Sequence, residues 1–373
     1  MRIWIDGYEA NVPQRLGSSQ VAFEILKNLE SIDQKNEYTI VLPQKPMDDL
    51  PKERKDWKYK ILKPNKLWTR IALPLALYTA KIKPDLIFSP THYIPRFSPV
   101  KRVVTIFDLA YLHYPQMYKK DDFWKLNNWS KFSIENADKI ITISNFCKQD
   151  IIKEYKINKD KIILAYPGYD AEIFHKIQDK NEVQKIVEKY QIQGKYIIYI
   201  GTIQPKKNLV RLIEAFGDID DLKLVIVGKT TGLGKQGWKF EEILKRPKEL
   251  GIEEKVIFTG FVPTEDLPYL LSGAEAFVLP SLYEGFGIPV VEAMACGIPV
   301  IVSNVASLPE VAGKAGLFID PLSVDQITQA IRTISSDKKL RLQKSKECLV
   351  QAKKFSWKNM AKIVLKTFEE VTK

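Results

Sequence analysis

The sequence is poor in the residues and segments that build disulfide scaffolds, metal clusters and membrane spans. Its 373 residues include three cysteines, Cys147, Cys296 and Cys348, whose wide separation gives neither a metal-ligand spacing nor a disulfide framework. The longest uncharged apolar run, residues 71–80, contains Pro74 and is too short to span a bilayer. The chain opens directly on a strand pattern with no basic leader, so we expect a cytoplasmic protein without a secretory signal.

Positive charge, in contrast, is plentiful: the formal net charge is +12 at pH 7 and the isoelectric point is near 9.2. This balance attracts phosphate groups, whether on nucleic acid, on a nucleotide-sugar or on anionic lipid. Cations concentrate in residues 52–70, beside Trp57, Trp68 and the apolar residues 71–78. The combination is typical of a face that rests on the inner leaflet of a membrane, and also of a solvated surface beside a core helix. We find no nucleic-acid recognition motif and expect no such partner.

Short apolar strands alternate with helical patterns along almost the whole chain. This order predicts parallel sheets built from βαβ units, and the length allows two Rossmann-like domains. A polar stretch at residues 176–189 separates the two halves. Strands are expected at residues 2–5, 38–42, 86–89, 102–106, 139–143 and 162–165 in the first half, and at 196–200, 223–227, 256–258, 276–279, 299–302 and 316–319 in the second.

The most informative segment is residues 274–297, in which a short apolar strand enters a Gly-x-Gly turn and then a helix. Gly285 and Gly287 allow the backbone to approach a ligand closely. The N-terminus of the helix favours a diphosphate. Glu284 on the loop would meet a sugar, and Glu292, eight positions later and about one turn into the helix, can accept two hydrogen bonds from a ribose diol. A solvated turn with two surface glutamates is the alternative.

Residues 260–321 resemble the donor half of the group 1 glycosyltransferases, a large family of retaining enzymes with the GT-B fold. The family pattern PSxxEGFGxPxxEAMAxGxPVI stands here as PSLYEGFGIPVVEAMACGIPVI. The similarity extends over nearly the whole chain and is weaker in the N-terminal half. It implies an α/β fold of two Rossmann-like domains whose parallel sheets face a central cleft. An acceptor domain would cover residues 1–170, a donor-nucleotide domain residues 171–355, and a helix in residues 356–373 would cross back to the first domain.

The resemblance also implies how a nucleoside diphosphate-sugar is held. Residues 201–208 resemble the phosphate loop of the family, with Lys207 the firm match and Lys206 its helper, although many relatives carry Arg where this chain has Thr202. Plain surface lysines are the alternative. The implied donor site consists of Gly201, Thr202, Lys206 and Lys207, of Phe261 and Val262 near the base, of Glu284, Gly285, Phe286, Gly287 and Ile288, and of Glu292 on the ribose.

In the first domain, Gly17 lies in a segment that resembles the glycine loop facing the donor phosphates, with a plain helix cap as the alternative. Close family members usually carry a histidine at the position of Phe107, and this departure puts the usual contact to the donor sugar in doubt. His92 and His113 are candidates to replace it. Asp108 would orient the sugar or an incoming hydroxyl.

Two further motifs are interpreted as structural. The Gly-x-Gly-x-x-Gly at residues 232–237 follows the second strand of its domain, whereas a dinucleotide fingerprint follows the first, so we interpret it as a basic loop. The Asp-x-Asp at residues 218–220 precedes a strand and is typical of a turn. We therefore expect neither a cofactor nor a metal.

The function that the resemblance implies is retaining, metal-independent transfer of a hexose to a glycan or lipid-linked acceptor. Glu284, Lys207 and Asp108 would carry the reaction, by attack of the acceptor on the same face that the leaving diphosphate vacates. Mannose and the assembly of surface polysaccharide are common among similar sequences. Three alternatives stay open: a sugar-nucleotide epimerase, a nucleic-acid-binding protein suggested by charge alone, and a catalytically silent binder of nucleotide-sugars, which Phe107 suggests.

Overall fold

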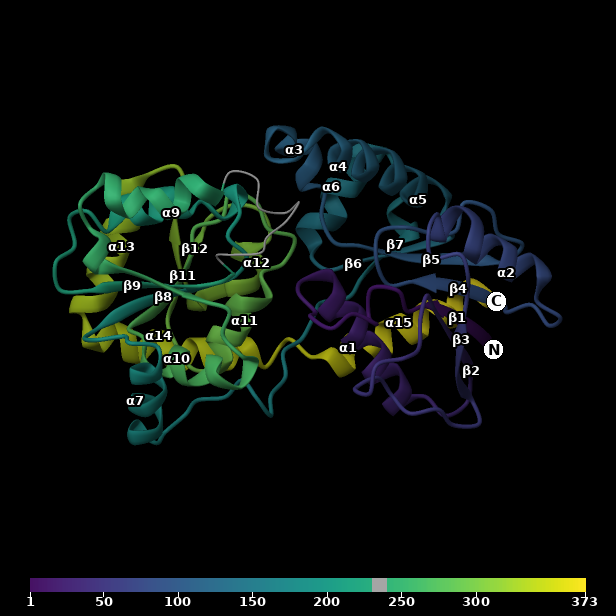
Figure 1. The fold of residues 1–373 in the computed structure, drawn as a ribbon, viewed down its shortest axis with the longest axis horizontal. Helices are drawn as coiled ribbons and strands as arrows, with labels where there is room; N and C mark the ends of the chain where they lie inside the picture. The colour runs from purple at the N-terminus through teal and green to yellow at the C-terminus, as the bar shows by residue number, and fades with distance from the viewer. Residues whose placement is uncertain (230–239) are drawn as a thin grey trace. The chain divides into compact units, whose positions relative to one another are not determined.

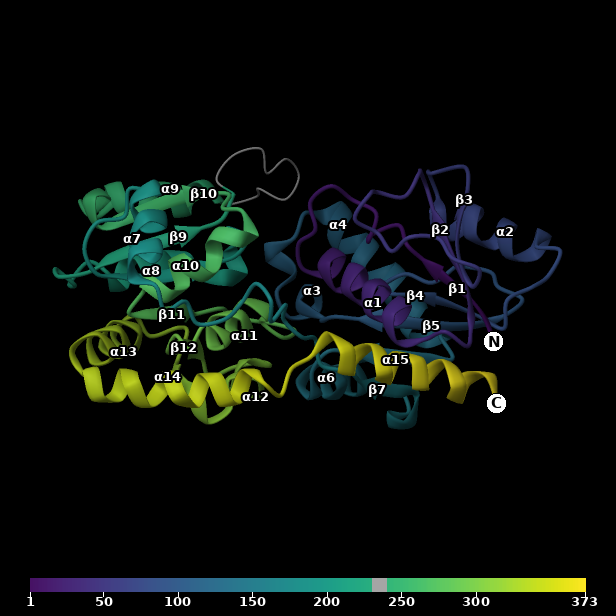
Figure 2. The ribbon, with the colours of Figure 1, turned by 90° about the horizontal axis from the view of Figure 1, so that it is seen from below.

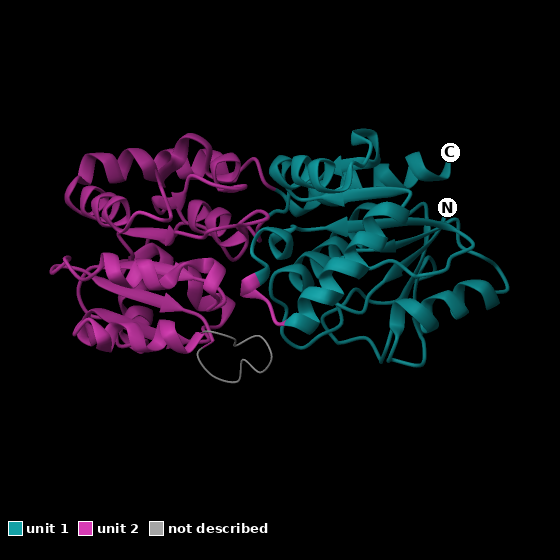
Figure 3. Ribbon diagram, turned by 90° about the horizontal axis from the view of Figure 1, so that it is seen from above, with its two compact units in different colours: residues 1–115, 120–168, 356–373 teal, residues 116–119, 169–355 magenta. Residues whose placement is uncertain are grey.

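The computed structural model describes residues 1–229 and 240–373, which form two compact units (Figure 3). Unit 1 contains residues 1–115, 120–168 and 356–373, and unit 2 contains residues 116–119 and 169–355. The main change of unit after residue 168 lies two positions before the expected boundary. Within the described residues, no helix combines the length and the apolar character needed to cross a bilayer.

Unit 1 is built on a seven-stranded parallel sheet with the strand order β3-β2-β1-β4-β5-β6-β7. The order reverses between β1 and β4, which makes the sheet doubly wound. The strands are β1 (Arg2–Asp6), β2 (Glu37–Leu42), β3 (Trp57–Ile61), β4 (Leu86–Ser89), β5 (Lys101–Ile106), β6 (Lys139–Thr142) and β7 (Ile162–Leu164).

Helices cover both faces of this sheet. Figures 1 and 2 show α1 and the C-terminal helix α15 side by side, and α15 also contacts β4, where the rings of Phe88 and Phe368 lie 5.2 Å apart. On the other face, η1 and α2 pack on Trp4, Val41 and Ile87. The helices are α1 (Ser18–Ile32), η1 (Trp68–Ala72), α2 (Leu73–Thr79), α3 (Ala110–His113), α4 (Lys120–Lys125), η3 (Leu126–Ser130), α5 (Lys131–Asn136), α6 (Asn145–Tyr155) and α15 (Trp357–Thr372).

Unit 2 repeats the plan with a six-stranded parallel sheet in the order β10-β9-β8-β11-β12-β13. Its central strands are buried along nearly their whole length, as expected where helices cover both faces. The strands are β8 (Tyr196–Ile200), β9 (Lys223–Val227), β10 (Val256–Gly260), β11 (Ala276–Leu279), β12 (Val300–Ser303) and β13 (Gly316–Ile319). The helices are α7 (Lys180–Lys189), η5 (Pro205–Lys207), α8 (Leu209–Ala215), α9 (Phe240–Glu249), α10 (Leu267–Gly273), α11 (Ile288–Ala295), α12 (Leu308–Ala312), α13 (Val324–Ser336) and α14 (Lys338–Ala352).

The two predicted Rossmann-like parallel sheets are confirmed, and every predicted strand is present within two residues of its expected ends. The edge strand β3 was not predicted. Its apolar residues alternate with Lys58 and Lys60, and this alternation lies inside the basic run. Trp57 and Trp68, which stand beside the basic run, are buried in unit 1 and so lie neither on a membrane-facing surface nor on a solvated one.

Candidate active site

The candidate site lies in unit 2, at the point where the strand order reverses between β8 and β11. Open α/β sheets bind ligands at the carboxyl ends of the strands at such a point. The two loops that leave these strand ends are joined by hydrogen bonds. The Leu282 amide donates to the Lys206 carbonyl oxygen at 2.9 Å, and the Asn208 side chain donates to the Pro280 carbonyl oxygen at 3.0 Å. The loop with the predicted lysines and the loop with Glu284 therefore form one connected structure.

Lys207 and Glu284 form a buried ion pair at the centre of this structure. The Lys207 Nζ donates to the Glu284 Oε1 at 2.5 Å, and the Ser281 hydroxyl donates to the same oxygen at 2.7 Å. The two charged side chains are 13% and 8% exposed. The pairing brings together two residues that lie 77 positions apart in sequence.

Opposing effects set the ionisation of Glu284. Burial raises its pKa, but the charges of Lys207 and Lys206 and the hydrogen bonds from Lys207 and Ser281 outweigh burial, so the pKa lies below its ordinary value. Glu284 is therefore a carboxylate at neutral pH. Its backbone is also held, because the Ser307 hydroxyl donates to the Glu284 carbonyl oxygen at 2.9 Å. Sequence reasoning did not identify Ser281 and Ser307.

The helix α11 begins behind the Gly-x-Gly turn as predicted. Gly287 has a φ of 95°, a conformation that side chains rarely adopt, and a Cβ there would lie 2.9 Å from the Leu308 side chain. Pro289 follows in the first turn, and no side chain caps this helix end. These features leave an uncapped helix N-terminus beside the Lys207–Glu284 pair on the same loop.

Glu292 is the second carboxyl of the predicted site, and its environment differs from that of Glu284. It lies on α11 and forms no side-chain hydrogen bond or ion pair with the described residues. Burial raises its pKa to about 8, and its charge in turn helps to raise the pKa of the buried Cys296 thiol. Without a protein partner, the Glu292 carboxyl is available to a ligand.

Glycines end the neighbouring strands β8, β9 and β10. The Gly201 amide donates to Val227, and the Gly228 amide donates to Gly260, each at 3.0 Å. A Cβ on Gly228 would lie 2.2 Å from the Gly201 carbonyl oxygen, and a Cβ on Gly201 would lie 2.7 Å from the Tyr199 hydroxyl. Only glycine fits at these two positions. Gly228 was not predicted, although a glycine directly after a buried strand is the signal that it shares with Gly201.

The remaining predicted donor residues lie around this edge of the sheet. Phe261, next to Gly260, is 56% exposed, whereas Val262 is buried. Thr202 and Lys206 are partly exposed in the loop after β8. Gly285, Phe286 and Ile288 lie between Glu284 and the first turn of α11, with Phe286 buried against Phe355.

Gly17 and Asp108 lie in unit 1. Gly17 has a φ of 57° and stands at the start of α1, which has no side-chain cap. Asp108 follows β5, and its Oδ1 accepts a hydrogen bond from the Ala110 amide at 3.0 Å at the start of the short helix α3.

Phe107 and the two candidate histidines, His92 and His113, all lie in unit 1. The side chain of Phe107 is buried, its ring centroid lies 5.2 Å from that of His92, and its carbonyl oxygen accepts a hydrogen bond from the Cys147 thiol. The Nε2 of His113 lies 2.9 Å from both carboxylate oxygens of the buried Asp150 on α6. This pairing favours a structural role for His113.

The two motifs interpreted as structural have different outcomes. Residues 232–237 lie outside the described residues. Asp220 lies ahead of β9, at the opposite end of the strand from Gly228, and its carboxylate pairs with Lys255 at 2.8 Å. Among the described residues, a group with the spacing of metal ligands is formed by His113, Asp150 and Glu154 in unit 1.

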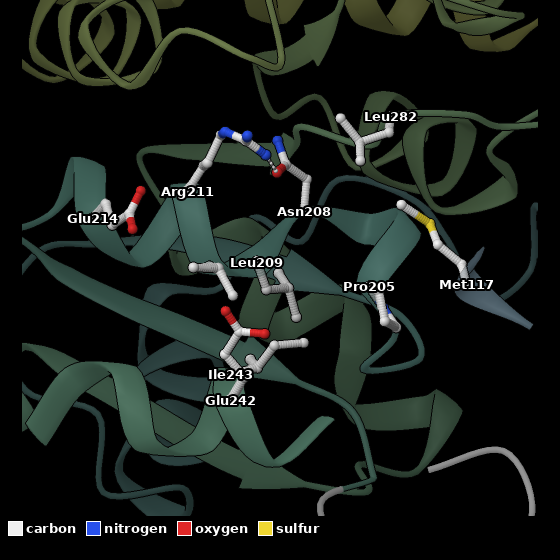
Figure 4. A pocket seen from close by; sticks show the side chains of 10 residues that line it. Met117, Pro205, Asn208, Leu209, Arg211, Glu214, Glu242, Ile243 and Leu282 are labelled. Carbon is white, nitrogen blue, oxygen red and sulfur yellow. Dashed lines mark hydrogen bonds between the residues drawn. The ribbon is translucent and has the colours of Figure 1, made fainter. Parts of the chain in front are cut away.

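A cavity of about 300 Å³ opens in unit 2 beside α8 and α9 (Figure 4). Its lining includes Asn208 and Arg211, whose side chains are hydrogen-bonded at 2.9 Å, and Glu242. Neither Lys207 nor Glu284 lines this cavity. The candidate site is thus defined by the strand ends and their charged side chains rather than by this cavity.

Comparisons with known proteins agree with this architecture. Residues 180–349 match the model of the glycosyl transferases group 1, and residues 17–173 match the model of glycosyltransferase family 4. The chain is 36% identical over 274 residues to the O-antigen chain mannosyltransferase B of Escherichia coli. The aligned region makes up 72% of this chain and 70% of that protein.

Solved structures with the GT-B fold are similar along the whole chain. Sucrose-phosphate synthase from Thermosynechococcus elongatus has a TM-score of 0.78 at 19% identity, covering 99% of this chain and 98% of its own. HepE (Alr3699) of Anabaena, in complex with UDP-glucose, has a TM-score of 0.77 at 17% identity, covering 99% of both chains. The chain therefore belongs to the group 1 glycosyltransferases, has their GT-B fold, and is similar among them to a mannosyltransferase.

Proposed function

We propose that the protein is a retaining glycosyltransferase that moves a hexose from a nucleoside diphosphate-sugar to a glycan or lipid-linked acceptor without a metal ion. One observation carries the proposal. Where the strand order of unit 2 reverses, between β8 and β11, Lys207 and Glu284 form a buried ion pair. The helix α11, which begins after Gly287 on the same loop, carries the Glu292 carboxyl without a partner among the described residues.

The donor would lie along this edge from base to sugar. Phe261, exposed at the end of β10, offers a surface for the base, and Glu292 would accept the hydroxyls of the ribose. The diphosphate would meet the positive side chains of Lys206 and Lys207 and the uncapped first turn of α11. Glu284 would accept hydroxyls of the sugar, since it stays ionised at neutral pH.

Chemistry at this site requires stabilisation of the leaving diphosphate. As the bond between the anomeric carbon and the phosphate oxygen breaks, negative charge grows on that oxygen, and fixed cations nearby stabilise it. The acceptor hydroxyl would attack the anomeric carbon from the same face and pass its proton to a phosphate oxygen, so that the configuration is retained. Asp108 of unit 1 would orient that hydroxyl.

The side chains that this edge provides support metal independence. Lys206 and Lys207 would neutralise the diphosphate in place of a divalent cation. The Asp-x-Asp sequence lies at the opposite end of β9, where Asp220 is paired with Lys255. The need for no metal stays a prediction, tested by activity in the presence of a chelator.

Mannose is the hexose that we propose, and a surface polysaccharide or its lipid-linked precursor is the acceptor. The 36% identity to the O-antigen chain mannosyltransferase B supports both choices. HepE binds UDP-glucose, which supports the class of donor but leaves the nucleotide base to experiment.

The test combines binding with turnover. Unfolding temperatures are measured with UDP-, GDP-, ADP- and dTDP-sugars in a chelator, and a donor at 100 times its Kd stabilises by about 2.7 kcal/mol. We expect one donor to raise the unfolding temperature of the wild type and to have a weaker effect on Glu292→Ala. With that donor, transfer to a mannoside acceptor should give a product whose anomeric configuration, followed by NMR, matches the donor. An inverted product would refute the retaining mechanism.

A catalytically silent binding protein is the second candidate, because Phe107 stands where a histidine usually contacts the donor sugar. It predicts a stabilising donor with no transfer to any acceptor and no slow hydrolysis of the donor. Transfer that is lost in Glu284→Ala, with donor binding retained, would exclude it.

A further inference from the structure

Exposed apolar side chains form a stripe along η1 and α2 of unit 1 and the residues on either side of them; α2 is labelled in Figures 1 and 2. Its members recur every three or four positions, the period of one helical face. They are Leu67, Ile71, Leu75, Tyr78 and Ile82, and between 43% and 63% of each side chain is exposed.

The opposite face of the same segment is already buried. Trp68, Leu73 and Leu77 pack with Trp4 and other core residues on the sheet. A surface helix normally has a polar outer face, so apolar side chains on both faces indicate a second apolar contact. The inner face packs the helix on the sheet, and the exposed apolar side chains of the outer face are available to a partner.

The sequence around the stripe is positively charged. No acidic residue occurs between Asp56 and Asp85, and the intervening residues include seven cations, all of them exposed: Lys58, Lys60, Lys63, Lys66, Arg70, Lys81 and Lys83. Lys66, Lys81 and Lys83 form no hydrogen bond or ion pair with the described residues. Apolar side chains flanked by lysines, with no carboxylate among them in sequence, match an anionic phospholipid surface. The apolar side chains would enter the acyl boundary, and the lysines would meet the headgroups.

We propose that residues 66–83 form a surface that binds the face of an anionic lipid bilayer. A second copy of this chain is a poorer occupant, because two such surfaces would bring like charges together with no carboxylate between them. The proposal is independent of the donor chemistry in unit 2, and it explains how the protein would reach a lipid-linked acceptor.

The surface is formed before any lipid binds. The Trp68 indole donates to the Asp6 carboxyl at 2.9 Å, which ties η1 to the end of β1. The Arg96 amide donates to the Thr69 carbonyl oxygen at 2.7 Å. Phe97, next to Arg96, is a further exposed aromatic side chain beside the start of the stripe. A pre-formed surface loses little conformational entropy on binding.

The experiment is co-sedimentation of the full-length protein with lipid vesicles. Vesicles of phosphatidylcholine with about 30% phosphatidylglycerol are compared with pure phosphatidylcholine, because anionic lipid supplies the electrostatic attraction. We expect binding to the anionic vesicles at least about tenfold tighter than to the neutral ones, and weaker binding at about 0.5 M salt. Failure of the wild type to sediment with anionic vesicles would overturn the proposal.

Variants locate the surface. Leu75→Glu, in the middle of the stripe, and the double variant Lys81→Gln/Lys83→Gln should each lower vesicle affinity about tenfold. The matched controls are Leu342→Glu and Lys339→Gln on α14, an exposed apolar residue and an exposed lysine of unit 2, which should bind as the wild type does. Equal binding by Leu75→Glu and the wild type would place the contact elsewhere and overturn the proposal.

Two further readouts separate the alternatives. Light scattering that shows a dimer in the wild type and a monomer in Leu75→Glu would identify a second copy as the occupant and overturn the lipid surface. Donor-induced stabilisation should be the same in Leu75→Glu and the wild type, which also shows that the variant folds. Loss of vesicle binding with intact donor binding therefore tests this surface, whereas loss of donor binding alone tests the site in unit 2.

Discussion

The two units share one strand order but differ at the carboxyl edge of their sheets. In unit 2 that edge carries glycines, lysines and the carboxyls of Glu284 and Glu292. In unit 1 the corresponding edge carries aromatic side chains, such as that of Phe107, together with the carboxyls of Asp6 and Asp108. Asp6, at the end of β1, accepts hydrogen bonds from Trp68 and Tyr8, and burial raises its pKa to about 7. The same scaffold thus supplies an edge with lysines, suited to a charged diphosphate, in unit 2, and an edge with carboxyls and aromatic rings in unit 1.

Removal of the central cation of unit 2 should have the largest effect on catalysis. Lys207→Ala should lower kcat by about 10²–10³-fold, because one fixed donor to a developing negative charge has about that effect. Lys206→Ala is the matched control, with a smaller loss expected, since the Lys207 Nζ bonds the Glu284 carboxylate directly and has the larger effect on its pKa. Steady-state kinetics with the identified donor measures both. A Lys207→Ala enzyme with wild-type kcat would show that the charged edge does not serve the leaving group.

The ionisation of Glu292 should make donor binding depend on pH. Its pKa is raised from 4.5 to about 8, so the carboxyl is mostly neutral at pH 7, and only the carboxylate accepts hydrogen bonds from both ribose hydroxyls. We expect donor affinity to rise several-fold, roughly up to tenfold, between pH 7 and pH 9. Titration calorimetry across this range measures the effect. Glu292→Gln should bind more weakly at pH 9 and show a flat profile, and an equally steep profile in that variant would assign the pH dependence to another group.

Stability provides an independent control for Glu292. A carboxyl whose pKa is higher in the folded than in the unfolded state binds more protons in the folded state. Its contribution to the free energy of unfolding is therefore full below pH 4.5 and is lost as the pH rises through about 8. Glu292→Gln should therefore match the wild type near pH 5 and exceed it at pH 9 by roughly 1–3 kcal/mol in free energy of unfolding. Denaturant unfolding at the two pH values measures the difference.

Much of unit 2 could be predicted from the sequence because its strands are continuous apolar runs buried on both faces. The strands at residues 196–200 and 276–279 have their predicted ends, and Lys207 and Glu284 were both chosen from the loops that follow them. The partners Ser281 and Ser307 could not be predicted, since a serine in a loop gives no sign of which oxygen it will bond.

Unit 1 was harder to predict where apolar and basic residues are mixed. The strand β3 alternates apolar residues with lysines, which resembles a charged surface as much as an edge strand. In residues 67–82 apolar positions occur on both faces of the helix, so periodicity could not say whether Trp68 or Leu75 is the buried one. Trp68 is the buried residue because it packs in the same cluster as Trp4, more than sixty positions earlier in sequence.

His113 tests whether unit 1 contributes a second polar group, besides Asp108, to the reaction. His113→Asn removes the contact with the buried Asp150 and should lower the free energy of unfolding by about 1–3 kcal/mol while leaving kcat unchanged. The exposed His175 is the matched control, and His175→Asn should change neither quantity. A large fall in kcat without loss of stability in His113→Asn would make His113 a substitute for the missing histidine.

The smallest expected effect concerns Phe107, where the aromatic edge of unit 1 departs from the family pattern. Phe107→His buries an imidazole in a site that now packs a hydrocarbon ring against His92, so we expect a loss of about 1–2 kcal/mol in free energy of unfolding and no gain in kcat. Phe107→Leu controls for lost packing without adding a polar group. If kcat rises about tenfold or more in Phe107→His alone, a catalytic contact is missing from the wild-type edge. The aromatic ring at this edge of unit 1 would then reflect lost activity rather than a different ligand.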